Sequence, residues 1–524
     1  MTRSLAAILV PGMLVLAGPT HGATASRDCA GLDGWTGDGT VVTAVEVATE
    51  SPSWPTHCRV LGTIDGTISF ELLLPDDWNG KFLMGGGGQF VGSLMNSAQY
   101  LSLPQRPASD SGPGSLAGLL FAEEIARLPL SQGYATAGTD TGHSGLPYLA
   151  DWELDNVKAV EDHAWRAVHR TAEVSKRLIS AYYGAGTERS YFLGCSTGGR
   201  QGLISAQRFP DDFDGIVAGA PGLDITGIAA WGVQAYQAGV IGTTPGSTGV
   251  LTEASTALVH RSIMAKCDAI DGVTDGIIDN PQSCDFDLDS LPVCDSTPSG
   301  QCLTIDQLAA TRALFTGPPD VGGFRSYPGL PMGSNISLWG SPLASVFFQL
   351  APEYFRYFVF NDPDWDPLRY DLSRWRHDSA EVSELMDAFS TDMREFRDRG
   401  GKLILWHGWS DEALSAQNTI DYYEALIADD DLTDEFARLF MFPGVMHCGG
   451  GNGPAFGDWT SVIDRWVERD QAPDSVLARR FVAPPPAPRE WTIERPVCAY
   501  PGVAVYNGSG EPAEAASYSC EVEN

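Results

Sequence analysis

The residues most able to do chemistry in this sequence surround a serine. Ser196 lies in Gly194-Cys195-Ser196-Thr197-Gly198, which matches the pattern G-x-S-x-G. A short apolar run precedes the motif, and a helix-like segment follows it from Gly199 to Arg208. A sharp turn between a strand and a helix holds the serine hydroxyl above the edge of a sheet, where it can attack a carbonyl. The motif predicts a catalytic Ser196, and the alternative is a glycine-rich turn with a surface serine.

A serine hydroxyl needs a general base, and the base needs an acid that orients it. Hydrolases with this turn have the chain order serine, then Asp or Glu, then histidine. Asp411 and His447 each follow a strand-like segment and have that order. The other histidines after Ser196 fit less well, because two fall in a segment of different character and one precedes Asp411: His260, His377 and His407. We therefore predict a triad of Ser196, Asp411 and His447.

Acyl transfer also requires backbone N–H donors for the oxyanion of the tetrahedral intermediate. Thr197 directly follows the nucleophile and is expected to supply one donor. The run Gly85 to Gly88 lets a backbone approach the substrate closely, so Gly86 and Gly87 are the candidates for the other. The alternative for the glycine run is a plain turn.

The elements that would position these groups alternate between strands and helices. Strand-like segments cover 63–75, 81–84, 134–138, 191–193, 216–218, 402–406 and 437–441, and helical periodicity covers 162–182 and 415–427. This alternation predicts a largely parallel sheet that is covered on both faces. We therefore expect an α/β fold, with an α/β-hydrolase core at 26–223 and 399–524. The segment 224–398 is rich in Asp, Gly, Pro and aromatic residues, and we interpret it as an inserted lid domain.

The first residues have the features of a signal peptide. Arg3, the apolar stretch from Leu5 to Leu16 and the small residues at Ala23-Thr24-Ala25 predict a signal at 1–25 with cleavage before Ser26. The net charge of -34 disfavours nucleic acid and anionic membranes as partners. The sequence thus predicts a secreted or periplasmic protein.

Ten cysteines follow the predicted signal, an even number that suggests disulfides in an exported chain. Short loops favour pairing of Cys267 with Cys284, Cys294 with Cys302, and Cys498 with Cys520, which would leave Cys29 with Cys58 and Cys195 with Cys448. Sequence alone does not fix this connectivity, and reduced, buried cysteines are the alternative. If Cys195 and Cys448 are bonded, their Cα atoms lie about 5.5 Å apart. The neighbouring Ser196 and His447 would then be held together.

The motif Gly194-Cys195-Ser196-Thr197-Gly198-Gly199, the Asp411 segment and His447-Cys448 resemble the tannase and feruloyl esterase family. The segments 74–80, 139–145 and 420–424 and the tail from Arg495 to Cys520 are similar as well. The resemblance implies hydrolysis of esters of aromatic acids, and it supports the cysteine pairing. A mono(2-hydroxyethyl) terephthalate hydrolase is another member, but no lid arginine is clearly placed to hold a substrate carboxylate.

The lid segment from Cys267 to Asp279 resembles the family's calcium loop. Calcium prefers six to eight oxygen ligands. The side chains of Asp268, Asp271 and Asp275 and the carbonyls of Val273 and Ile277 could supply them. We expect a structural Ca²⁺ there, and the alternative is an acidic, solvated loop.

The resulting prediction is a serine esterase that cleaves small aromatic esters. A lipase or peptidase with the same triad is a second possibility. An inactive, calcium-stabilised binding protein is a third.

Overall fold

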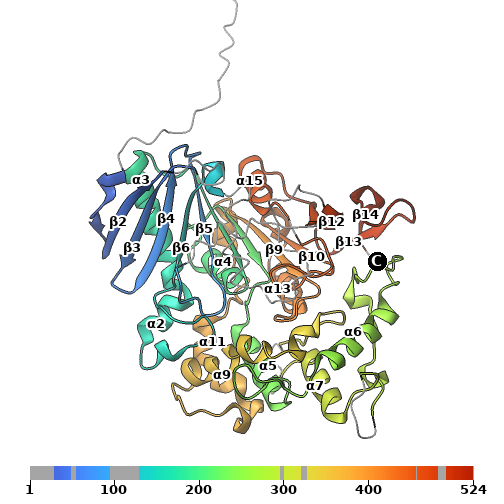
Figure 1. The fold of residues 1–524 in the computed structure, drawn as a ribbon. Coiled ribbons are helices and arrows are strands. Elements are labelled where there is room, and N and C mark those ends of the chain that lie inside the picture. The colour runs from blue at the N-terminus through green and yellow to red at the C-terminus, as the bar shows by residue number, and fades with distance from the viewer. Residues whose placement is uncertain are drawn as a thin grey trace, which may run out of the picture.

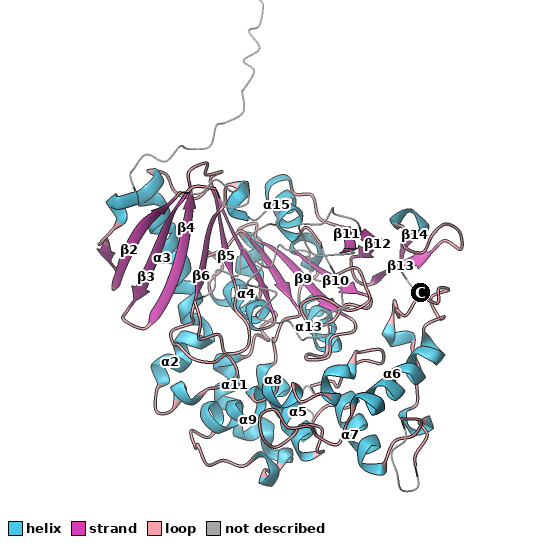
Figure 2. Ribbon diagram, viewed as in Figure 1, coloured by secondary structure: helices cyan, strands magenta, loops and turns pink. Residues whose placement is uncertain are grey.

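The computed structural model describes residues 29–48, 55–94, 129–294, 300–319, 327–455, 457–481 and 491–522. The predicted signal peptide at 1–25 lies outside these ranges. Figure 1 shows a twisted sheet with helices packed against it, above a further group of helices, and Figure 2 shows that the strands lie in the upper part.

The sheet contains ten strands of the described residues in the order β1-β2-β3-β4-β6-β5-β7-β8-β9-β10. The strands from β1 to β4, and β4 with β6, pair antiparallel. From β6 to β10 all neighbours are parallel. Their bounds are β1 (Thr36–Gly37), β2 (Thr40–Val47), β3 (His57–Ile64), β4 (Ile68–Pro75), β5 (Lys81–Gly85), β6 (Ala135–Thr139), β7 (Arg189–Cys195), β8 (Gly215–Gly219), β9 (Lys402–Gly408) and β10 (Ala437–Phe442).

Alternation along the strands directs side chains into a core on each face of the sheet. On β5, Phe82 and Met84 enter one core and Leu83 enters the other. The first core also takes residues of α3 (Ala167–Tyr183), α4 (Thr197–Arg208) and α13 (Ala416–Asp429), whereas α15 (Trp459–Arg469) packs into the second. The sheet is therefore covered on both faces, which explains why its central strands are almost uniformly apolar.

The described residues between β8 and β9 form helices joined by loops, with no named strand, and they have a core of their own. Trp231, Trp339 and Trp375 are almost fully buried in it. Figure 1 places its helices below the sheet. We call this segment, 224–398, the lid. Its α-helices are α5 (Ile225–Gln237), α6 (Glu253–Cys267), α7 (Ile305–Phe315), α8 (Ala344–Phe347), α9 (Leu350–Glu353), α10 (Trp375–Asp378), α11 (Ala380–Met386) and α12 (Arg394–Asp398).

Several aromatic side chains of the lid pack together in this core. Trp339 and Phe348 stack with ring centroids 3.8 Å apart, and Tyr354 stacks on Phe358 at 5.1 Å. Phe347 is only partly buried, and its carbonyl accepts a hydrogen bond from Gln89 Nε2 at 3.3 Å. The lid thereby contacts the loop that follows β5.

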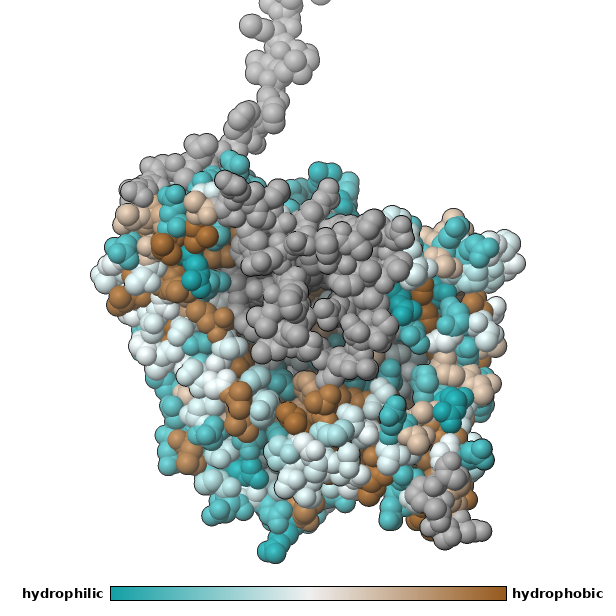
Figure 3. All heavy atoms as spheres, in the orientation of Figure 1, coloured by the Kyte–Doolittle hydropathy of each residue, from teal (hydrophilic) through white to brown (hydrophobic). Residues whose placement is uncertain are grey.

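Two small antiparallel sheets complete the C-terminal part, and the sequence patterns did not predict them. They are formed by β11 (Ser475–Phe481) with β12 (Trp491–Cys498) and by β13 (Gly502–Tyr506) with β14 (Tyr518–Val522). No helix among the described residues is long and apolar enough to cross a membrane. Figure 3 shows hydrophilic and hydrophobic residues interspersed over the described surface on this side.

All ten cysteines form disulfides, in the five pairs favoured by the sequence. They are Cys29–Cys58, Cys195–Cys448, Cys267–Cys284, Cys294–Cys302 and Cys498–Cys520. Cys195–Cys448 differs from the others because it joins residues 253 positions apart, between the ends of β7 and β10.

Candidate active site

Ser196 occupies the turn between β7 and α4. Its φ of 64° and ψ of -124° are strained for a residue with a Cβ, and such strain is common at functional turns. The Ser196 N–H donates to Gly219 O at 3.0 Å, and its carbonyl accepts from Arg200 and Gly222. These bonds fix the strained backbone, and the side chain stays partly exposed at the carboxyl end of β7.

The glycines of the motif are required by close backbone approaches. A Cβ on Gly194 would lie 2.3 Å from the Gly198 carbonyl oxygen, and a Cβ on Gly198 would lie 3.1 Å from Gly86 Cα. Larger residues at either position would push α4 away from β5 and β7. The two outer glycines of G-x-S-x-G therefore let the helix that begins after Ser196 pack tightly on the sheet.

Asp411 and His447 meet at the same edge of the sheet, because β9 and β10 are parallel and each residue follows one of them. His447 Nδ1 lies 2.8 Å from Asp411 Oδ2. Asp411 is fully buried, and its Oδ1 accepts from the backbone N–H groups of Ala413 and Leu414, both at 2.8 Å. The histidine side chain is 22% exposed, so it is partly accessible from outside the site.

The pKa values of Asp411 and His447 are shifted in opposite directions by their surroundings. Burial alone would raise the pKa of Asp411, but the neighbouring His447 and His407 hold this pKa below its usual range. For His447, burial acts to lower the pKa, but the Asp411 carboxylate outweighs it and raises the pKa above the usual value. Asp411 is thus an anion at any pH at which His447 can exchange a proton.

The disulfide Cys195–Cys448 links the two loops that carry Ser196 and His447. Its Cα atoms are 5.9 Å apart. Because each cysteine directly precedes or follows one of these residues, the bond limits how far the serine and the histidine can separate. The predicted triad residues are thereby brought together at one sheet edge.

Two further polar residues surround Asp411 and were not among the predicted site residues. His407, which the chain-order rule set aside as the base, lies with Nε2 3.0 Å from Asp411 Oδ2. Glu412 accepts the backbone N–H of His447 at 3.2 Å. Burial, followed by repulsion from Asp411, raises the pKa of Glu412 to about 7. The adjacency of Glu412 to Asp411 was visible in the sequence, but the pattern gave no reason to single it out.

The predicted oxyanion donors are placed differently from one another. Thr197 is the first residue of α4, where an N–H has no acceptor within the helix. The Gly86 N–H donates to Leu193 O at 2.9 Å, so the sheet already uses it. The Gly87 N–H donates to Gln201 Oε1 at 3.1 Å, so its acceptor is a side chain and not the sheet. This geometry favours Thr197 and Gly87 over Gly86.

The chain is similar to known proteins over most of its length. Residues 55–521 match the family described as tannase and feruloyl esterase. The chain belongs to this family. It is 31% identical to a probable feruloyl esterase B of Aspergillus clavatus over 88% of the chain and 86% of that protein. It is also 31% identical to the mono(2-hydroxyethyl) terephthalate hydrolase of Piscinibacter sakaiensis over 91% of the chain and 87% of that protein.

Solved structures support the same conclusion. The crystal structure of feruloyl esterase B from Aspergillus oryzae superposes with a TM-score of 0.78 at 28% identity, covering 93% of this chain and 98% of that chain. The tannin acyl hydrolase from Aspergillus niger shares the fold, with a TM-score of 0.68 at 22% identity over 93% of this chain and 91% of that chain. The expected α/β-hydrolase fold is confirmed, and the chain is a carboxylic ester hydrolase.

The predicted calcium loop of this esterase is stabilised within itself. Asp268 Oδ1 accepts from Gly276 N–H at 2.9 Å, and Asp271 accepts from Val273 and Asp279 at 3.0 and 3.2 Å. Arg495 forms ion pairs with Asp275 and Asp279. In the part of the chain that is described, no three His, Cys, Asp or Glu side chains converge on one metal position. The oxygen chemistry of the loop suits calcium, but binding would require its carboxylates to turn toward a common point.

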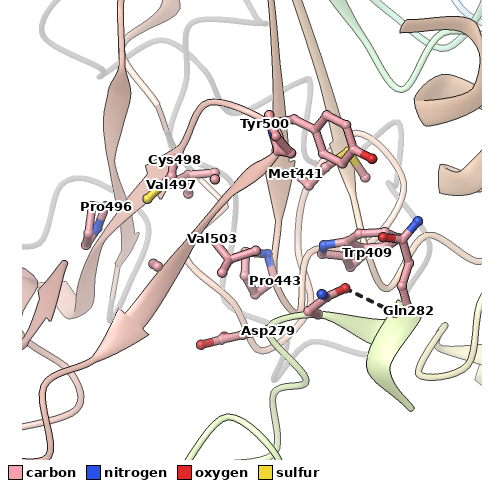
Figure 4. Close-up of a pocket in the computed structure, with 14 residues that line it drawn as sticks. Asp279, Gln282, Trp409, Met441, Pro443, Pro496, Val497, Cys498, Tyr500 and Val503 are labelled. Carbon is pink, nitrogen blue, oxygen red and sulfur yellow. Dashed lines mark hydrogen bonds between the residues drawn. The ribbon is translucent and has the colours of Figure 1, made fainter. Parts of the chain in front are cut away.

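A pocket of about 220 Å³ lies where the lid, the core and the C-terminal tail meet (Figure 4). The lid supplies Asp279 and Gln282, the core supplies Trp409 and Met441, and Tyr500 comes from the C-terminal tail. Neither Ser196 nor His447 lines it. The cavity is therefore separate from the candidate active site.

Proposed function

We propose that this protein is a secreted serine esterase that cleaves esters of aromatic, phenolic acids, with Ser196 as nucleophile, His447 as base and Asp411 as the orienting acid. The observation that carries the proposal is the placement of His447, bonded to Asp411 and tied to Ser196 through Cys195–Cys448. The names of the relatives, feruloyl esterase B above all, support the aromatic acyl group.

The proposed reaction has two steps. Ser196 Oγ attacks the ester carbonyl as His447 Nε2 takes the hydroxyl proton, and the N–H groups of Thr197 and Gly87 receive the developing oxyanion. His447 then gives the proton to the departing alcohol, which leaves an acyl-serine. Water attacks this acyl group with His447 again as base, and the aromatic acid and the free serine result.

Charge supports a neutral ester over an anionic one. The chain carries a net charge of -34, which opposes the approach of an anion. Among the cations of the lid, Arg356 is paired with Glu353 at 2.5 Å, so its charge is already compensated. A terephthalate monoester carries a free carboxylate, and this makes it the second candidate behind feruloyl and galloyl esters, favoured by the relative from Piscinibacter sakaiensis.

We also propose a structural Ca²⁺ held by Asp268, Asp271, Asp275 and the carbonyls of Val273 and Ile277. Support comes from the donor chemistry: the loop gathers four carboxylates, counting Asp279, against the single guanidinium of Arg495. Export to an oxidising compartment is supported by the five disulfides and by the signal-like N-terminus.

The test is hydrolysis of methyl ferulate, methyl gallate, a terephthalate monoester and a long-chain nitrophenyl ester by the wild type and by Ser196→Ala. We expect turnover of a neutral aromatic ester that the substitution abolishes. Turnover of the long-chain ester alone would contradict the aromatic assignment. A serine-directed fluorophosphonate provides a separate test, since a folded wild type that takes no label would favour a binding protein over an enzyme.

A further inference from the structure

His407 is a fully buried histidine with a polar partner on each ring nitrogen. It lies on β9 and its side chain is 0% exposed. Nδ1 is 2.8 Å from the hydroxyl of Thr419 on α13, and Nε2 is 3.0 Å from Asp411 Oδ2. The ring therefore connects a core helix to the acid that orients His447.

The environment of Asp411 fixes the direction of these hydrogen bonds. Two backbone N–H groups donate to Oδ1, and two imidazole nitrogens face Oδ2. An ionised carboxylate can only accept, so both His407 Nε2 and His447 Nδ1 must carry a hydrogen. In a neutral imidazole the other nitrogen then accepts, and the Thr419 hydroxyl is placed to donate to it.

We propose that His407 is a positioning residue for catalysis: with Thr419 bonded to Nδ1 and Nε2–H as the donor, it holds Asp411 Oδ2 in the orientation that His447 requires. The inference rests on the triad proposed above and acts only through Asp411. Asp411 Oδ2 is the anionic oxygen that His447 needs when it becomes a cation. A second cation on Oδ2 would have to be desolvated without a partner of its own.

A histidine that only fills the core would act differently. Its replacement would change stability, whereas loss of a positioning bond also changes the chemical step. Without the His407 donor, Asp411 is less fixed, so kcat falls. The Asp411 carboxylate, with one donor fewer, also stabilises the His447 imidazolium more strongly and raises the pKa of His447. The acid limb of kcat/KM therefore moves to higher pH.

Three variants separate these roles: His407→Leu, His407→Gln and Thr419→Val. Leucine fills space without a donor, and glutamine restores an N–H near the position of Nε2. Valine leaves the imidazole in place but removes the group that sets its tautomer. The other titratable groups around Asp411, Glu412 and Tyr327, are unchanged in all three. Each variant is assayed on the best ester of the panel for kcat, KM and the pH profile, and its folding is checked by circular dichroism and thermal unfolding.

We expect His407→Leu to lower kcat roughly tenfold or more, the loss that corresponds to one buried charged hydrogen bond, with little change in KM. His407→Gln should recover most of kcat and return the acid limb to the wild-type pH, and Thr419→Val should show a smaller loss of kcat. Should His407→Leu fail to fold, the Gln and Val variants decide.

A folded His407→Leu with wild-type kcat and pH profile would overturn the inference. So would a folded Gln variant as impaired as Leu, or, where Leu does not fold, a Thr419→Val variant with unchanged kcat. Ser196→Ala in the same series distinguishes failure of the proposed triad from failure of the proposed role of His407. If Ser196→Ala remains active, the proposed triad fails; if only Ser196→Ala is inactive, the triad stands and the role of His407 falls.

Discussion

Removing the disulfide beside the triad is the perturbation whose outcome the structure defines most clearly. The double substitution Cys195→Ala and Cys448→Ala breaks a bond between residues 253 positions apart. Both cysteines are replaced so that no free thiol remains. The change touches neither Ser196 nor His447, but it releases the two loops that carry them.

The size of the effect follows from the loop and from the site. For so long a loop, chain entropy predicts a stabilisation of about 5 kcal/mol, and measured disulfides typically give about 2–4 kcal/mol. Once the bond is gone, Ser196 and His447 can separate by an ångström or more. Such a misplacement costs on the order of a hundredfold in rate. We therefore expect kcat to fall by about that factor and the unfolding midpoint to drop.

The assay compares kcat and the thermal unfolding midpoint of this variant with those of Cys498→Ala/Cys520→Ala. The control removes a disulfide between two strands at the C-terminal end of the chain, with a separation of 22 residues. We expect the control to lose stability and to keep kcat. The reasoning is refuted if the first variant folds and keeps wild-type kcat, or if the control loses kcat to the same extent.

Three further predictions concern the acid, its neighbour and the calcium loop. Asp411→Asn should lower kcat by about a hundredfold to ten-thousandfold in the ester assay. The reason is that the amide NH₂ faces either two backbone N–H donors or two imidazole N–H donors, whichever way the amide is turned. A loss of kcat below tenfold would contradict this. In the wild type, kcat/KM should fall as the pH drops through the raised pKa of His447. Glu412→Gln should move this acid limb of the pH profile to lower pH, because it removes a negative charge that stabilises the His447 imidazolium. An unchanged acid limb would show that Glu412 does not act on His447. Chelation of calcium should lower the thermal unfolding midpoint of the wild type but not that of Asp271→Asn. If the wild type has the same midpoint with and without added Ca²⁺, a stabilising calcium site is excluded.

The parallel strands and the triad positions could be predicted because each has a local signature. β7, β9 and β10 are short apolar runs, and each is followed within a few residues by a polar candidate. The predicted strand at 63–75 in fact spans the end of β3 and all of β4, with a turn at Asp65 and Gly66 between them. Apolar alternation continues across so tight a turn, so the pattern alone does not show the break.

Other features depend on hydrogen bonds and packing between segments that are distant in the sequence. The Gly86 N–H donates to the sheet and the Gly87 N–H donates to a side chain, because the ladder between β5 and β7 ends one residue past the strand. The sequence does not show where that ladder ends. The packing of the lid depends on contacts between short helices that are distant in sequence, and their periodicity is too brief to read. The division into core and lid at 224 and 398 follows the composition of the chain and stays a prediction.

Asp411 and Glu412 show why one of two adjacent carboxylates is suited to be the triad acid. Both are buried, so burial alone would raise the pKa of each. Asp411 receives four N–H donors, two from the backbone and two from imidazoles, and stays ionised. Glu412 accepts the backbone N–H of His447 at 3.2 Å and is repelled by Asp411, so its pKa rises to about 7. A buried carboxylate that must remain ionised beside a base is stabilised by N–H hydrogen-bond donors, because water is excluded from it. The backbone turn after β9 and the ring of His407 supply them to Asp411 alone, and this difference, rather than chain order, is the physical reason to assign the role to Asp411.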